Sequence, residues 1–244
     1  MRSSMIGWFF RKKQIDVKVD IHSHLLPGID DGVKSFEEAL KIILHLKKLG
    51  YEKLITTPHI YQDYYPNTPV IIREKLDALK VELKNSAIEI EVEAAAEYFV
   101  DGTFIDLVKN GDEVLCFGKD NYVLIETGFQ HKPIILDEAI FELKTRSFTP
   151  ILAHPERYEY IDAKLTLLHE LREKGVKLQV SLPSLKGYYG PEPKRIATKL
   201  LKKQMVDFLG SDLHRESQLE GLGNALKTKI LDNPILNNEL MDNN

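Results

Sequence analysis

The chain has 244 residues, and its 43% hydrophobic content is ordinary for a globular protein with a sizeable core. A net charge of −4 at pH 7 argues against a general nucleic-acid-binding protein, which would carry a basic surface. The single cysteine, Cys116, excludes a disulfide within the chain and fits a reducing compartment. We therefore expect a cytoplasmic protein with one α/β domain over residues 15–244.

Residues 1–14 are expected to form an apolar and basic extension. Residues 8–10 are aromatic and residues 11–13 are basic, whereas a signal peptide carries its charge before a longer apolar run. Two interpretations stay open for this extension. It is either a frayed or docked terminus, or a weak contact with an anionic membrane surface, into which the aromatic rings insert. The second interpretation would place the protein peripherally at the inner membrane.

Short apolar runs alternate with amphipathic segments along the rest of the chain. The runs predict strands at residues 17–21, 53–57, 88–95, 122–126, 149–153, 177–181 and 206–210. The amphipathic segments predict helices at residues 36–49, 70–85, 133–144, 164–174, 191–203 and 216–228. Ser35 and Gly50 fit the N-cap and C-cap of the first helix. Seven strands that alternate with helices favour a closed (β/α)7 barrel, with an open doubly wound sheet as the alternative.

Histidines and carboxylates follow the ends of most of these predicted strands. The candidate metal ligands are His22, His24, Asp31, His59, Glu97, Glu126, His154, Asp212 and His214. Because the carboxyl ends of barrel strands meet at one face, a barrel would gather these side chains at one point. Imidazole and carboxylate ligands suit Mn²⁺, Fe²⁺ or Zn²⁺, and so many ligands exceed what one ion can use. We therefore expect three divalent ions, with a carboxylate bridging two of them.

The charge of such a site favours a phosphate substrate. Three divalent ions and four carboxylates leave a net charge of about +2 when the histidines are neutral, which complements a phosphate monoester dianion. The ions would contact the phosphoryl oxygens, lower the pKa of a bound water and stabilise the leaving oxygen. Arg157, three residues after His154, is placed to add a bidentate phosphate contact.

The motifs around these residues resemble the polymerase-and-histidinol-phosphatase (PHP) superfamily, and more closely its bacterial protein-tyrosine-phosphatase branch. The segments that carry the resemblance are Asp20-Ile21-His22-Ser23-His24, Pro27-Gly28-Ile29-Asp30-Asp31-Gly32, Thr57-Pro58-His59, Ala96-Glu97-Tyr98, Leu124-Ile125-Glu126, Ala153-His154-Pro155-Glu156-Arg157-Tyr158, Gly187-Tyr188-Tyr189-Gly190 and Ser211-Asp212-Leu213-His214. The resemblance implies a distorted (β/α)7 TIM-like barrel. It also implies a manganese-dependent phosphatase that acts on a tyrosine kinase of capsule or exopolysaccharide synthesis, with the kinase tail as partner.

The resemblance also implies how the ligands are shared among three ions. His22, His24, Glu97 and Asp212 would hold one ion, Glu97, Glu126 and His154 a second, and Asp31, His59 and His214 a third. A metal-bound hydroxide would attack phosphorus directly, without a phosphoenzyme. We expect Asp212, His214 and Arg157 to be catalytic, and Arg157 matches the phosphate-binding arginine of the family.

Two further residues are candidates for substrate binding. Some relatives carry a second active-site arginine several residues after the Ser-Asp-x-His motif, and the nearest candidate here is Arg215, directly after His214. Tyr188 is the candidate for contact with an aromatic leaving group. More tyrosines could rim the same cleft, or could be ordinary loop residues: Tyr61, Tyr64, Tyr65, Tyr158 and Tyr189.

Two other functions stay open. A small-molecule phosphomonoesterase of the histidinol-phosphatase type would share every ligand and differ only in its pocket. A non-catalytic kinase-binding module would keep the barrel, although the complete set of ligands argues against it. A nuclease role would need a basic surface, which the composition does not provide.

Overall fold

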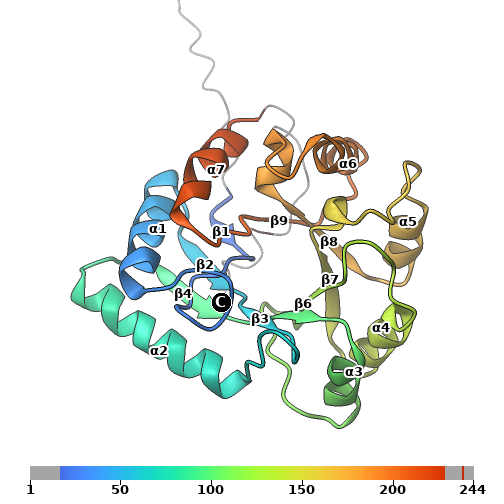
Figure 1. The fold of residues 1–244 in the computed structure, drawn as a ribbon, viewed down its shortest axis with the longest axis horizontal. Coiled ribbons are helices and arrows are strands. Elements are labelled where there is room, and N and C mark those ends of the chain that lie inside the picture. The colour runs from blue at the N-terminus through green and yellow to red at the C-terminus, as the bar shows by residue number, and fades with distance from the viewer. Residues whose placement is uncertain (1–16, 229–237, 239–244) are drawn as a thin grey trace, which may run out of the picture.

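A computed structural model of the chain describes residues 17–228 and residue 238. In this part of the chain, short parallel strands form an inner ring that helices surround (Figure 1). The strands are β1 (Val19–Asp20), β2 (Lys53–Thr56), β3 (His59–Ile60), β4 (Glu91–Ala94), β5 (Glu97–Phe99), β6 (Tyr122–Glu126), β7 (Thr149–Ala153), β8 (Lys177–Ser181) and β9 (Phe208–Gly210). The α-helices are α1 (Phe36–Leu49), α2 (Pro69–Asn85), α3 (Gly102–Lys109), α4 (Leu136–Thr145), α5 (Thr166–Glu173), α6 (Pro191–Lys202) and α7 (Leu219–Leu226). The 3₁₀ helices are η1 (Pro155–Arg157), η2 (Leu182–Lys186) and η3 (Glu216–Gln218).

The predicted extension at residues 1–14, together with its hypothetical membrane contact, lies outside the described residues. The predicted start of the domain at residue 15 falls just before the first described residue. None of the helices in the described part of the chain is long and apolar enough to cross a membrane.

The barrel is distorted because its second and third strand positions are each broken in two. β2 pairs with β1 and β4 in one sheet, whereas β3 and β5 belong to a second sheet with β6, β7, β8 and β9. Pro58, which has no N–H to donate, lies between β2 and β3, and Ala95 and Ala96 lie between β4 and β5. The predicted (β/α)7 barrel is therefore confirmed in a distorted form, with seven strand positions of which two consist of two pieces.

Among the described strands and α-helices, the sequence pattern does not predict β3, β5 and α3. The two strands are two and three residues long, too short to show a periodicity of their own. The helix α3 has only eight residues and begins after Asp101, whose side chain accepts a hydrogen bond from Phe104 N. The predicted caps of α1 are confirmed, since Ser35 accepts from Glu38 N and Gly50 adopts a φ of 105°.

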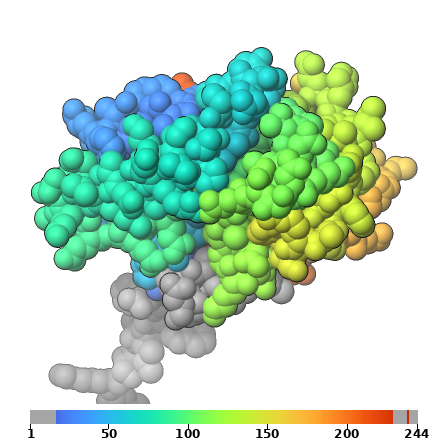
Figure 2. Space-filling view, turned by 90° about the horizontal axis from the view of Figure 1, so that it is seen from below, coloured from blue at the N-terminus to red at the C-terminus, as the bar shows by residue number. Residues whose placement is uncertain are grey.

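Apolar side chains fill the inside of the ring on the N-terminal side of the predicted ligands. This inner cluster consists of Val19, Ile21, Ile55, Ala95, Phe117, Tyr122, Leu124, Ile151, Ala153 and Phe208. A larger cluster packs the outer faces of the strands against the helices. Figure 2 shows α2 (teal to green) and α3 with α4 (green to yellow-green) covering one flank of the molecule. The ring is therefore a packed core with its polar groups collected at one end, as is typical of a TIM-like barrel.

The barrel closes between β1 and β9 without a regular ladder. Ser23 and Leu213 form an isolated parallel bridge just beyond the two strands. His24 N donates to Leu213 O at 2.9 Å, and Asp212 N donates to His22 O at 2.8 Å. These bonds hold the His-x-His segment directly beside the Asp-x-His segment.

Asn238 bridges the same two strands with its side chain. Its Oδ1 accepts from Leu209 N at 2.9 Å, and its Nδ2 donates to Leu209 O at 2.8 Å and to Val19 O at 2.9 Å. Only 1% of Asn238 is exposed. The amide therefore satisfies backbone groups that a regular ladder between β1 and β9 would otherwise pair.

We predict that Asn238→Ala lowers the free energy of unfolding by about 1–3 kcal/mol, because it leaves buried backbone groups of β1 and β9 without partners. Equilibrium urea unfolding measures this difference. The control is Asn85→Ala, at the exposed end of α2, which should change stability by less than about 0.5 kcal/mol. Equal stability of Asn238→Ala and the unchanged protein would contradict the closure described here.

Candidate metal centre

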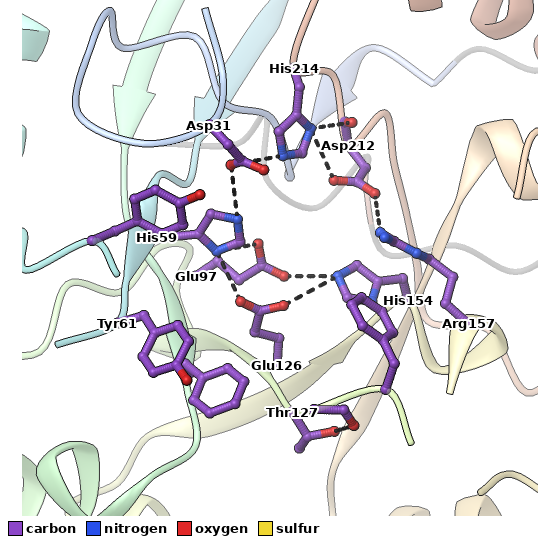
Figure 3. A pocket seen from close by; sticks show the side chains of 14 residues that line it. Asp31, His59, Tyr61, Glu97, Glu126, Thr127, His154, Arg157, Asp212 and His214 are labelled. Atoms are coloured by element: carbon purple, nitrogen blue, oxygen red, sulfur yellow. Dashed lines mark hydrogen bonds and ion pairs between the residues drawn. The ribbon is translucent and has the colours of Figure 1, made fainter. Parts of the chain in front are cut away.

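The nine predicted ligands all lie at the carboxyl ends of the barrel strands or in the loops that follow. His22 and His24 follow β1, and Asp31 lies on the loop between β1 and α1. His59 is the first residue of β3, and Glu97 is the first residue of β5. The remaining ligands end or follow β6, β7 and β9, and they are Glu126, His154, Asp212 and His214. Figure 3 shows the side chains that line the pocket converging on one another from these different elements.

The breaks in the second and third strand positions place two of these ligands side by side. His59 of β3 and Glu97 of β5 are direct partners in the parallel register of the second sheet. In the same sheet, Phe99 of β5 is the partner of Glu126 at the end of β6. The short strands that the sequence pattern does not predict are therefore the elements that set the positions of His59 and Glu97.

The ligand atoms form four overlapping groups, and the atoms of each group lie within 4.8 Å of one another. The groups are His24, Asp31, His59 and His214; His22, His24 and Asp212; His22, Glu97 and His154; and His59, Glu97 and Glu126. Every predicted ligand belongs to at least one group, and none is left apart. The overlap indicates a site in which neighbouring ions would share ligands.

Glu97 lies at the centre of the cluster and is fully buried. Its Oε2 is 3.1 Å from His22 Nε2, 3.4 Å from His24 Nε2 and 3.3 Å from His59 Nδ1. Its Oε1 is 3.0 Å from His154 Nε2. One carboxylate that faces four imidazoles with its two oxygens has the geometry of a bridging ligand.

The arrangement of these donors fits divalent cations. His22 Nε2 and His24 Nε2 lie only 3.2 Å apart and both face the Glu97 carboxylate. Two imidazole nitrogens at this separation can share a single proton, whereas a cation would be bound by both lone pairs at once. The donor set contains imidazoles and carboxylates without thiolates, which suits Mn²⁺, Fe²⁺ or Zn²⁺.

Carboxylates control the protonation of the buried histidines. Burial lowers the pKa of His22, but the Glu97 and Asp212 carboxylates outweigh it and raise the pKa above its ordinary value. Burial also opposes charge on His24, and the Asp30 carboxylate nevertheless raises the pKa of His24 to about 10. Both shifts favour protonation of these imidazoles in the metal-free protein, so protons compete with a metal ion at these ligands.

Two of the candidate ligands adopt a backbone conformation that is rare for residues other than glycine. His154 has a φ of 32° and Asp212 has a φ of 52°, both in the left-handed region. Such conformations cost about 1–3 kcal/mol each and collect at functional sites, where the surrounding structure enforces them. The strain therefore supports a functional role for both strand ends.

Arg157 lies beside the cluster and is held on three sides. Its Nη1 donates to Asp212 Oδ2 at 2.8 Å. Its guanidinium lies 4.8 Å from the centre of the Phe129 ring and 4.1 Å from the centre of the Tyr189 ring. Tyr189 also donates its hydroxyl to Asp212 Oδ2 at 2.9 Å. The arginine is thus fixed between two aromatic faces at the edge of the candidate metal centre.

A cavity of about 230 Å³ gives access to the cluster and to Arg157. One wall of this cavity is aromatic: Tyr61 and Phe99 stack with their ring centres 4.0 Å apart, and Tyr65 stacks on His59 at 5.3 Å. The cavity therefore combines polar groups that can bind an anion with a flat apolar wall.

The structure separates the two candidate substrate-binding residues from this cavity. Tyr188 and Arg215 are not among the residues that line it, and about half of the Tyr188 side chain is exposed. The neighbouring Tyr189 makes the contacts with Arg157 and Asp212 instead. Sequence reasoning places both tyrosines in one loop, and it cannot tell which of two adjacent rings turns inward.

Other tyrosines are divided between the cavity and the interior. Tyr61 and Tyr65 line the cavity, whereas Tyr64 is largely exposed. Tyr158 is buried behind the site, where its hydroxyl accepts from Thr127 N at 3.2 Å, directly after Glu126. Tyr158 thus supports a ligand-bearing strand end and does not rim the cavity.

Comparisons with known proteins agree with this site. A family model for capsular polysaccharide synthesis, CpsB/CapC, matches residues 18–225. The tyrosine-protein phosphatase YwqE of Bacillus subtilis (strain 168) is 32% identical over 197 residues, which cover 80% of this chain and 77% of that protein. CapC of Staphylococcus aureus is 30% identical over 215 residues, which cover 86% of this chain and 84% of that protein.

The fold is also similar to a solved structure. The match is to a crystal structure from work on YwqE of Bacillus subtilis and CpsB of Streptococcus pneumoniae, described as metal-dependent tyrosine phosphatases. It has a TM-score of 0.77 and 27% identity, and it covers 87% of this chain and 89% of that one. Because the family model matches most of the chain and two relatives are at least 30% identical over most of their length, this chain belongs to the capsular polysaccharide synthesis CpsB/CapC family.

Proposed function

We propose that this chain is a metal-dependent protein-tyrosine phosphatase that hydrolyses phosphotyrosine on a protein of capsule or exopolysaccharide synthesis. The observation that carries the proposal is the cluster of nine imidazoles and carboxylates, most of them buried, beside Arg157 at the base of a cavity with an aromatic wall. The relatives named as tyrosine-protein phosphatases support the same activity.

We propose three divalent ions, most consistent with Mn²⁺, as the cofactors. The overlap of the ligand groups supports this number, because Glu97 belongs to two groups and His24 belongs to two. Divalent ions bound there would neutralise the phosphoryl oxygens and supply a nucleophile from water at neutral pH. Fe²⁺ and Zn²⁺ suit the same donors.

We propose that Arg157 binds the phosphoryl group. Its guanidinium is fixed by Phe129, Tyr189 and Asp212, and it keeps donors that can face the cavity. A planar guanidinium can bind two phosphate oxygens at once. Asp212 and His214 would act beside it, since both line the cavity and belong to the ligand groups.

The aromatic wall supports an aromatic leaving group. Tyr61 lies across the cavity from Arg157 and Asp212 (Figure 3). The ring of Phe99, which also lines the cavity, stacks on the Tyr61 ring. A phosphotyrosine side chain could place its phosphate at the arginine and its ring against this wall, where offset stacking is favourable. The partner would be a protein with an accessible phosphotyrosine segment, such as the tail of a bacterial tyrosine kinase, acting in the cytoplasm near the inner membrane.

The first test compares two substrates in the presence of Mn²⁺. A phosphotyrosine peptide should be hydrolysed with a higher kcat/KM than histidinol phosphate. Its phosphate is bonded directly to a phenyl ring that can lie against the aromatic wall, whereas the imidazole ring of histidinol phosphate is separated from its phosphate by an aliphatic chain. His154→Ala protein, purified in parallel, is the blank that reveals any contaminating phosphatase. A clear preference for histidinol phosphate would contradict the proposal and favour a small-molecule phosphomonoesterase.

The second prediction concerns Arg157. Arg157→Ala should raise the inhibition constant of inorganic phosphate about 10- to 100-fold, because a charge-assisted hydrogen bond contributes about 1.5–3 kcal/mol. Phosphate inhibition of peptide hydrolysis measures the constant. Arg195→Ala is the matched control, since Arg195 lies on α6, pairs with Glu192 and is not among the residues that line the cavity. An unchanged constant in Arg157→Ala would refute the assigned role.

The third prediction concerns pH. Because the pKa values of His22 and His24 are raised in the metal-free protein, protons compete with metal at these ligands. The affinity for Mn²⁺ should therefore increase from pH 6 to pH 8, and binding should release protons. Calorimetry in buffers of different ionisation enthalpy measures the release. Affinity that does not depend on pH, with no proton release, would contradict the protonated state described above.

A further inference from the structure

Two buried polar side chains that are not candidate metal ligands contact the histidines of the His-x-His motif. They are Asp30, on the loop between β1 and α1, and Gln179, in the middle of β8. Asp30 is 6% exposed and Gln179 is fully buried. Burying a carboxylate or an amide next to imidazoles destabilises the fold unless the buried group forms good hydrogen bonds. The hydrogen bonds of these two side chains therefore indicate what they do in the site.

Asp30 joins three segments of the site. Its Oδ2 lies 2.8 Å from His24 Nδ1 and accepts from His59 N at 3.2 Å. Its Oδ1 accepts from Gly32 N at 2.9 Å. The loop packs closely against His24 at this point, as shown by the fact that a Cβ added at Gly32 would lie 2.3 Å from His24 O. Asp30 thus holds one imidazole, the backbone of a second ligand and its own loop.

Gln179 makes the corresponding contacts on the other side. Its Oε1 lies 3.0 Å from His22 Nδ1 and accepts from His154 N at 3.2 Å. The fit is tight, because a Cβ at Gly210 would lie 2.6 Å from Gln179 Nε2 and 2.7 Å from His22 Cβ. Gln179 therefore also holds one imidazole and the backbone of a second ligand, which is the residue with the left-handed φ of 32°.

Both contacts have the same chemical consequence. An acceptor at Nδ1 stabilises the tautomer that carries its proton there, and this leaves Nε2 with a free lone pair. His22 Nε2 and His24 Nε2 are the atoms that lie 3.2 Å apart and face Glu97 Oε2. The two acceptors thus direct the correct nitrogen of each imidazole toward the candidate metal centre.

We propose that Asp30 and Gln179 are positioning residues that fix His24 and His22 as Nε2 metal ligands and thereby set the metal affinity. The inference rests on the proposed metal centre and does not require a particular substrate. A carboxylate polarises an imidazole more strongly than an amide does, so Asp30 contributes more than Gln179 to the basicity of its histidine.

The test measures Mn²⁺ affinity directly, by the electron paramagnetic resonance signal of free Mn²⁺ during titration of metal-stripped protein. Asp30→Ala and Gln179→Met remove the acceptors and should weaken Mn²⁺ binding about 10- to 100-fold, with the larger loss for Asp30. The conservative variants Asp30→Asn and Gln179→Glu keep an acceptor oxygen and should recover part of the affinity.

Two matched controls separate positioning from loss of stability. Asp207→Asn changes a buried carboxylate that accepts from Leu178 N, and Asn238→Ala removes a buried amide that bonds β1 and β9. Neither residue contacts a candidate ligand side chain, so both variants should bind Mn²⁺ with unchanged affinity. The proposal would be overturned if the two controls lost as much Mn²⁺ affinity as the Asp30 and Gln179 variants.

Nitrogen-15 NMR of the Zn²⁺-loaded protein, which is diamagnetic, provides a readout that a merely structural role would not change. The proposal expects a proton on Nδ1 and a metal on Nε2 in both His22 and His24. A metal on Nδ1 of either residue, or unchanged Mn²⁺ affinity in Asp30→Ala and Gln179→Met, would refute it. The unchanged protein could prove to hydrolyse no phosphotyrosine while Asp30→Ala and Gln179→Met still weaken Mn²⁺ binding. In that case this inference would stand and the proposed activity would fail.

Discussion

The site depends on the Glu97 carboxylate, a buried anion that faces four histidines. A carboxylate removed from water costs several kcal/mol unless opposite charge and hydrogen bonds compensate it. His22, His24, His59 and His154 surround Glu97 at 3.0–3.4 Å. In the metal-free protein the Glu97 carboxylate raises the pKa values of His22 and His59 in spite of their burial, so that positive charge on these imidazoles can compensate the buried anion. Divalent cations can compensate the same buried charge. The stability of the fold and the affinity for metal therefore depend on the same cluster of side chains.

Breaks in the backbone bring these groups together, and one side chain connects them to the proposed phosphate-binding residue. The breaks at Pro58 and at Ala95 and Ala96 move β3 and β5 into the second sheet, where His59 and Glu97 are register partners. At the other side, Asp212 has one oxygen near His22 and His24 and the other at Arg157 and Tyr189. A single carboxylate therefore links the candidate metal centre to the proposed phosphate-binding arginine.

The sequence alone predicts the barrel and the nine candidate ligands, because imidazoles and carboxylates after buried strands follow a simple rule of barrel geometry. It does not predict contacts that depend on backbone direction within a loop or on packing across the barrel. Asp30 and Asp31 are adjacent carboxylates, yet one holds an imidazole from behind and the other faces the cavity. Gln179 resembles an ordinary polar residue of a strand until β8 is placed beside His22.

Hydrolysis of a phosphotyrosine peptide by metal-stripped protein, with and without added Mn²⁺, tests the central claim most directly. The account predicts that the stripped protein is inactive and that Mn²⁺ restores turnover, because the buried cluster supplies ligands in place of a nucleophilic side chain. Full activity without metal would contradict a metal-dependent mechanism. A protein that stays inactive with Mn²⁺, Fe²⁺ and Zn²⁺, while folded, would contradict the proposed phosphatase and favour a non-catalytic kinase-binding module.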